Sequence, residues 1–151
     1  MDENEFNQYV TDRYEDQVKW YNKKANQNKR VYEIIQWGVI VFSTITPVLI
    51  LIGNTGQRWL AAGVAFLVAV GTSLLKAFKY QENWIHYRTT CELLKKEIHY
   101  FKAGIDDYKK STDPKGLFVE RVEDLISREN TLWLTIQKIE KDRAKKKITL
   151  K

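Results

Sequence analysis

The sequence predicts an all-α membrane protein: a two-span transmembrane helical hairpin that is continuous with long cytoplasmic helices forming a coiled-coil-like bundle. Two observations predict it. Charged residues make up 29% of the 151 residues, yet none lies between Ile34 and Gln57 or between Trp59 and Leu75. The charged flanks carry apolar residues at alternating steps of three and four, which is typical of packed helices. We expect a single domain over 1–151.

Two segments have the length and composition of membrane spans. A bilayer core about 30 Å thick needs about 20 apolar residues in a helix. Residues 34–52 meet this requirement, and residues 59–75 meet it at the short end, with Lys76 and Lys79 placed to snorkel to the interface. The alternative is the buried hairpin of a soluble protein, but no third continuous apolar segment exists to cover these two. Residues 53–58 form the external turn.

The distribution of cations predicts the orientation of the hairpin. Cytoplasmic ends of spans carry an excess of Lys and Arg. The turn contains Arg58 alone, whereas the two outer flanks hold a larger set: Lys19, Lys23, Lys24, Lys29 and Arg30 before the first span, and Lys76, Lys79 and Arg88 after the second. Both termini are therefore expected in the cytoplasm.

The first span carries a line of residues that are close together around a helix, three of them polar: Gln36, Ile40, Ser43, Pro47, Ile50 and Asn54. Two interpretations stay open. In the first, these are pore-lining residues of a water-filled path. In the second, they form a hydrogen-bonded contact between helices. Because neither span contains Asp, Glu, Lys, Arg or His, a proton relay is disfavoured.

The second span carries a ridge of small residues at every fourth position, which lets another helix approach closely: Ala61, Ala65, Ala69 and Ser73. A ridge of this kind predicts helix packing between copies. The main expected partner is therefore the chain itself, in a homo-oligomer within the lipid bilayer.

Three cytoplasmic helices are expected, over 5–33, 76–108 and 117–147. The middle one has an unbroken apolar seam: Trp84, Tyr87, Cys91, Leu94, Ile98, Phe101, Ile105 and Tyr108. In the loop that follows, Asp113 is placed as an N-cap and Pro114 as the first helical residue.

The last helix repeats the pattern, with a seam through Phe118, Val122, Leu125, Glu129, Leu132, Ile136 and Ile139. Glu129 is the exception on this seam, and an unpaired buried carboxylate would be costly. We therefore expect a cytoplasmic polar core in which Arg13 or Arg88 pairs with Glu129.

The residues give no indication of an enzyme, a cofactor, a metal, a nucleic-acid partner or a small-molecule substrate. Cys91, the single cysteine, lies on the apolar seam and is expected to be a small buried hydrophobe. His86 and His99 have no ligands at metal spacing. The basic C-terminal end, residues 144–151 with Lys138, Lys141 and Arg143, fits either anionic lipid headgroups or a solvated tail.

Several motifs occur in order around the hairpin: Arg13-Tyr14-Glu15-Asp16-Gln17, Trp20-Tyr21, Glu82-Asn83-Trp84-Ile85-His86-Tyr87-Arg88, Glu92-Leu93-Leu94-Lys95 and Glu129-Asn130. Together they resemble the bacterial family catalogued as domain of unknown function 4231. That family looks related to the SLATT proteins, two-span membrane proteins proposed to assemble into pores.

The resemblance implies an oligomer in the bacterial inner membrane. Two functions follow as expectations. One is an ion channel or pore-forming effector. The alternative is a non-conducting membrane anchor or scaffold whose cytoplasmic helices recruit a partner.

Overall fold

The computed structural model describes residues 1–53 and 58–128, and its contacts divide the chain into two compact units. One unit comprises Met1–Trp20 and Thr89–Lys151, and we call it the terminal unit. The other comprises Tyr21–Arg88, and we call it the hairpin unit. Every regular element in the described ranges is helical, which confirms the all-α prediction.

The chain starts with α1 (Glu3–Tyr9), which a capping box begins. The Asp2 carboxylate accepts from the Glu5 amide at 2.8 Å, while the Glu5 carboxylate accepts from the Asp2 amide at 3.1 Å, so two helix-end donors are satisfied. A π-helical turn, η1 (Val10–Tyr14), then leads directly into the long helix α2 (Glu15–Ile52). The predicted passage from a polar helix straight into the first apolar segment is confirmed.

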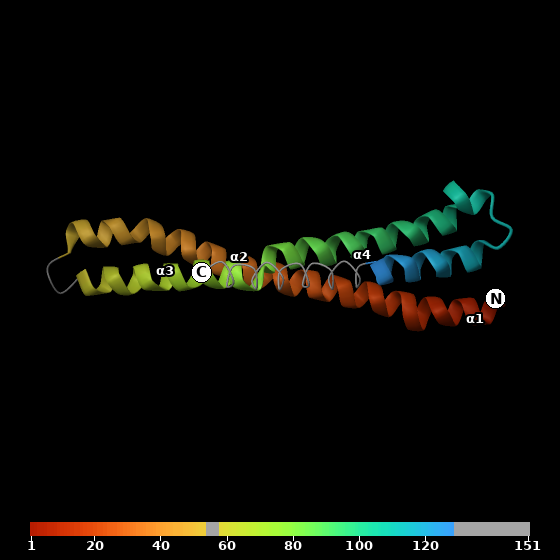
Figure 1. Ribbon diagram of the computed structural model, residues 1–151, viewed down its shortest axis with the longest axis horizontal. Coiled ribbons are helices and arrows are strands. Elements are labelled where there is room, and N and C mark those ends of the chain that lie inside the picture. The colour runs from red at the N-terminus through yellow and green to blue at the C-terminus, as the bar shows by residue number, and fades with distance from the viewer. Residues whose placement is uncertain (54–57, 129–151) are drawn as a thin grey trace, which may run out of the picture. The chain divides into compact units, whose positions relative to one another are not determined.

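The terminal unit also contains the second part of α4 (Tyr80–Ala103), the 3₁₀ turn η2 (Asp106–Lys109) and a helix over residues 114–128. In Figure 1, α1 and the 114–128 helix lie beside the end of α4. Aromatic rings join these helices, because Phe6 lies 5.1 Å from Phe101 and 5.8 Å from Phe118 between ring centroids. The core of this unit is therefore largely aromatic.

The predicted apolar seam of α4 is mostly confirmed. Cys91 and Leu94 are fully buried and Tyr108 is 4% exposed, whereas Ile105 is 46% exposed. Ile105 departs from the pattern because α4 ends at Ala103 and Gly104 takes a φ of +60°, so the residues beyond no longer follow the helical spacing.

The cap of the last helix is confirmed. The Asp113 carboxylate accepts from the Gly116 amide at 3.0 Å, and Pro114 is the first helical residue. Phe118 and Val122 are buried as expected, but Ile126 is buried in place of Leu125, which is half-buried. The remainder of this seam, from Glu129 to Ile139, lies outside the described residues.

The hairpin unit pairs α2 with α3 (Arg58–Phe78), and the two run side by side in Figure 1. They approach closely at Gly71, where a Cβ atom would lie 2.9 Å from Val39 Cγ2 and 3.6 Å from Ile35 Cγ2. At the other end of the unit, Tyr32 stacks on Trp84 with ring centroids 6.5 Å apart. Gly71 thus allows the close approach of α3 to α2, and the ring pair joins α2 to the first part of α4 within the same unit.

A break at Lys79 separates α3 from α4, although an uninterrupted helix was expected over 76–108. Lys79 takes a φ of +50°, in the left-handed region that side chains rarely adopt. The side-chain Nδ2 of Asn83 donates to the carbonyl of Phe78 at 3.2 Å and satisfies an acceptor that the end of α3 leaves open. The break went unpredicted because its neighbourhood contains neither Gly nor Pro.

Gly71→Ala is predicted to destabilise the hairpin, and Gly63→Ala is the matched control. Both substitutions raise helix propensity by about 1 kcal/mol. Of the two, only the Cβ atom added at Gly71 would have neighbours within 4 Å, and the nearer one, at 2.9 Å, belongs to the stiff Val39 side chain. Overpacking of this kind costs about 1–3 kcal/mol. Thermal unfolding in detergent should show Gly71→Ala melting below Gly63→Ala, and Val39→Ala should restore it. Equal melting temperatures would contradict the close approach.

Candidate functional site

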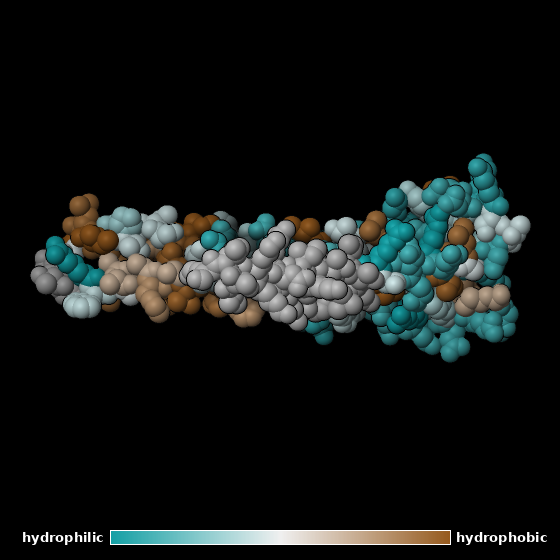
Figure 2. Space-filling view, in the orientation of Figure 1, coloured by the Kyte–Doolittle hydropathy of each residue, from teal (hydrophilic) through white to brown (hydrophobic). Residues whose placement is uncertain are grey.

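The hairpin unit exposes large apolar side chains along both of its helices. Leu51 is 88% exposed and Trp59 is 80% exposed, and many others are also accessible, including Ile45, Val48, Ile50, Ile52, Leu60, Phe66 and Leu67. Figure 2 shows hydrophobic side chains over α2 and α3 of the hairpin and mainly hydrophilic ones over the terminal unit. The described residues include two helical stretches long enough and apolar enough to cross a membrane, judged by length and composition.

The predicted pore-lining residues do not share one environment. Ile40, Ser43, Pro47 and Ile50 are exposed, whereas Gln36 is half-buried in a cleft. Asn54 lies outside the described residues. The line is therefore exposed from Ile40 to Ile50 and partly buried at its Gln36 end.

The hydroxyl groups near this line are bonded within α2. Ser43 Oγ donates to the carbonyls of Val39 and Ile40, and Thr46 Oγ1 donates to that of Phe42 at 2.7 Å. These bonds use the hydroxyl protons but leave oxygen lone pairs able to accept from water. The serine is consequently compatible with an apolar surrounding and with an aqueous one.

The ridge of small residues on α3 is divided in a similar way. Ala61 is buried, while Ala65, Ala69 and Ser73 are exposed. Ser73 Oγ donates to the Ala69 carbonyl at 2.8 Å, so this side chain also presents no unbonded proton. Three of the four predicted packing residues therefore form a smooth, accessible strip on the outside of the hairpin.

A cleft of about 360 Å³ lies in the hairpin unit beside the break at Lys79. Its walls include Tyr32 and Gln36 from α2, Lys76 from the end of α3, and Lys79 and Glu82 from the break and the start of α4. Lys79 Nζ lies 3.9 Å from Glu82 Oε2. The cleft is thus a recess whose mainly apolar walls carry charged and polar groups.

In the terminal unit, Arg13 pairs with Glu123. Arg13 Nε and Nη2 donate to the two Glu123 oxygens at 3.1 and 3.2 Å, and the Tyr9 hydroxyl donates to Glu123 Oε1 at 3.0 Å. The Arg13 guanidinium holds the pKa of Glu123 below its usual value, and burial raises that of Tyr9.

Of the predicted polar core, the structure describes Arg13 and Arg88 and does not describe Glu129. Arg13 has Glu123 as a partner, one that the sequence reasoning missed. Arg88 is exposed, and Glu129 lies outside the described residues, as does the basic end with Lys138, Lys141 and Arg143. The spacing of Tyr9 and Arg13, one helical turn apart, was a signal for a shared acidic partner.

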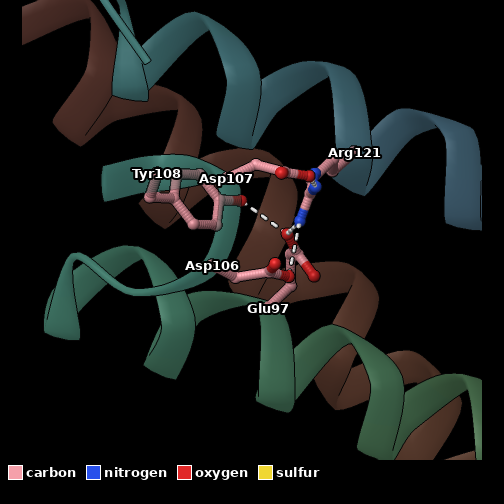
Figure 3. Close-up of polar contacts among 5 residues, drawn as sticks. All are labelled: Glu97, Asp106, Asp107, Tyr108 and Arg121. Atoms are coloured by element: carbon pink, nitrogen blue, oxygen red, sulfur yellow. Dashed lines mark hydrogen bonds and ion pairs between the residues drawn. The ribbon is translucent and has the colours of Figure 1, made fainter. Parts of the chain in front are cut away.

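A second polar cluster surrounds Arg121 (Figure 3). The Arg121 guanidinium donates to Glu97 at 3.1 Å and also pairs with Asp107, while the Tyr108 hydroxyl donates to the same Glu97 oxygen at 2.6 Å. Its hydrogen bond to Glu97 raises the pKa of Arg121. The cluster ties η2 and the 114–128 helix to α4, and its geometry is that of a structural clamp.

Helices, an apolar hairpin and structural polar clusters define this chain as a helical-bundle protein, and the described residues contain no group of three or more metal-ligating side chains placed to hold an ion. Residues 16–116 match the model of the family described as protein of unknown function (DUF4231), and the chain belongs to that family. No curated protein and no solved structure matches it.

The buried phenols of the terminal unit predict a loss of stability in alkali. Burial raises the pKa of Tyr14 from 10.0 to about 12, and it raises the pKa values of Tyr9 and Tyr108 as well. Because the folded state holds these protons more tightly than the unfolded chain, the free energy of unfolding is unaffected below about pH 10 and falls as the pH rises from there through about 12.

Thermal unfolding between neutral pH and alkali measures this loss. Replacing all three tyrosines by phenylalanine should flatten the alkaline decline relative to wild type, even though the variant is less stable at neutral pH through lost hydrogen bonds worth about 1 kcal/mol each. Parallel curves for the variant and wild type would contradict the assignment.

Proposed function

We propose that the chain is a two-span protein of the bacterial inner membrane, in which copies assemble into an ion-conducting pore. The observation that carries the membrane part is the exposure of the hairpin. A helix pair in the core of a soluble protein would be buried. Here the most apolar stretch of the first helix is 0% buried and that of the second is 6% buried. In water such a surface would be a large exposed apolar patch, but in a bilayer it meets lipid.

Charge supports the orientation. The described flanks of the hairpin hold Lys23, Lys24, Lys29 and Arg30 before the first apolar segment and Lys76 and Lys79 after the second, against Arg58 near the turn. Under the positive-inside rule both termini are cytoplasmic, and the turn is external.

A cysteine introduced at Asn54 is predicted to react with a membrane-impermeant maleimide in intact cells. The background is Cys91→Ala, so that the introduced cysteine is the single reactive thiol. Native Cys91 is fully buried, and alanine is a small apolar replacement for it. A cysteine at Asp2 is the control and should react only after permeabilisation. The reverse pattern would overturn the orientation, and reaction of both positions only after permeabilisation would overturn the external turn.

The geometry of the hairpin supports assembly. Two packed helices cannot enclose an aqueous path, so conduction requires several copies. The exposed strip of Ala65, Ala69 and Ser73 offers the close backbone approach that helices use in membranes. The exposed line of Ile40, Ser43, Pro47 and Ile50 is then available for the shared axis, with the two isoleucines as apolar constrictions.

The second candidate function is a non-conducting anchor or scaffold whose terminal unit recruits a partner. The hydroxyls of Ser43 and Thr46 favour it, because their protons are bonded inside α2 and need no water. The family of the chain favours the pore, because that family looks related to the SLATT proteins, which are proposed to permeabilise membranes as oligomers.

Ile50→Asn is predicted to raise the resting ion leak of reconstituted vesicles several-fold, because a polar side chain wets an apolar constriction. Leu51→Asn is the matched control. It introduces the same group one residue along, about 100° around the helix, where Leu51 is even more exposed than Ile50.

Insertion of each variant is verified by extraction at alkaline pH before flux is compared. A leak specific to Ile50→Asn supports the pore. Equal leaks from both variants, or no flux from any variant that is correctly inserted, would exclude the pore and leave the anchor.

A further inference from the structure

We propose that the cleft at the Lys79 break is a binding site for the phosphate of an anionic phospholipid headgroup. The inference rests on the proposed membrane location of the hairpin and adds a specific lipid site to it. It concerns a different part of the chain from the basic C-terminal end, because every residue that lines the cleft belongs to the hairpin unit.

The helix break creates this cleft. In a continuous helix, Lys76 and Lys79 would lie one turn apart on a convex surface. The left-handed conformation of Lys79 and the cap from Asn83 to Phe78 end α3 there, and both lysines line the recess that results. A left-handed lysine costs free energy, so the surrounding contacts must hold the break in place.

The lining suits a phosphate diester. Lys76 and Lys79 bring two ammonium groups and Glu82 brings one carboxylate, so the lining carries a net charge of +1, complementary to a singly charged headgroup. Among the described residues Lys76 has no acidic partner, and the Gln36 amide adds neutral hydrogen-bonding groups. Glu82, 3.9 Å from Lys79, competes with the ligand for that lysine.

Position favours a lipid over a soluble phosphate. Leu75 closes the second uncharged segment, Lys76 follows it directly, and both line the cleft. The cleft therefore straddles the point where a spanning helix would leave the hydrocarbon and meet the headgroups. Basic pockets between helices on the cytoplasmic side are sites of this type. At about 360 Å³ the cleft admits a headgroup and leaves the acyl chains against the exposed apolar surface.

The experiment uses the full-length protein in lipid nanodiscs that contain either phosphatidylcholine alone or phosphatidylcholine with phosphatidylglycerol. Native mass spectrometry measures how much phosphatidylglycerol stays bound to each protomer. Lys76→Gln combined with Lys79→Gln should weaken retention by at least about tenfold, given the contribution of each lysine near an anionic surface. Glu82→Gln should strengthen retention, an effect that loss of a merely structural contact would not produce.

Lys23→Gln combined with Lys102→Gln is the matched control, because it removes the same charge from two exposed lysines that do not line the cleft. Equal loss in the control, or unchanged retention in the cleft variant, would overturn the lipid site. Displacement of the lipid by millimolar inorganic phosphate would also overturn it and assign the cleft to a soluble ligand. Resistance of each protein to alkaline extraction is scored separately, so a failure of the membrane location is distinguishable from a failure of the site.

Discussion

The hairpin cannot cover its own apolar side chains, and most other features of the molecule depend on this constraint. When α2 and α3 pack through Gly71 and Val39, each helix buries one narrow face, and large side chains such as Leu51 and Trp59 remain accessible. The hydrophobic effect penalises that surface in water at about 25 cal/mol per Å². The described residues leave this apolar surface uncovered. In our proposal lipid and further copies cover it.

The terminal unit is also helical, but it has few apolar side chains to bury, where the hairpin has too many to cover. Its polar sequence leaves few aliphatic residues for a core, so rings contribute much of the contact: Phe6, Tyr14, Phe101 and Phe118 pack together. Buried tyrosines bring hydroxyl groups that need partners, and each has one. Tyr14 donates to the Leu94 carbonyl and Tyr108 to Glu97. The Glu97 oxygen that accepts from Tyr108 also accepts from Arg121, so this buried phenol and the Arg121 cluster share one carboxylate.

Features that depend on local sequence were predictable, and features that depend on contacts between distant residues were not. The Asp113 cap follows from one carboxylate and a proline, and the seam through Cys91 and Leu94 follows from spacing alone. The Lys79 break is an exception among the local features: the Asn83 side chain that stabilises it is close in the sequence, but no Gly or Pro nearby indicates a helix end. Glu123 was missed because its partners, Tyr9 and Arg13, lie more than a hundred residues away in the sequence.

The chemistry of α2 limits what a pore through this protein could do. No charged side chain lies between Ile34 and Ile52, and the Ser43 and Thr46 hydroxyls already donate to carbonyls of their own helix. A path along this line would offer ions oxygen lone pairs and a few isoleucines, with no ring of fixed charge to select among them. Selectivity would then be weak, and closing such a path would require only that the apolar positions dewet. A pore of this composition, as we propose it, would collapse an ion gradient and would not transport one particular ion.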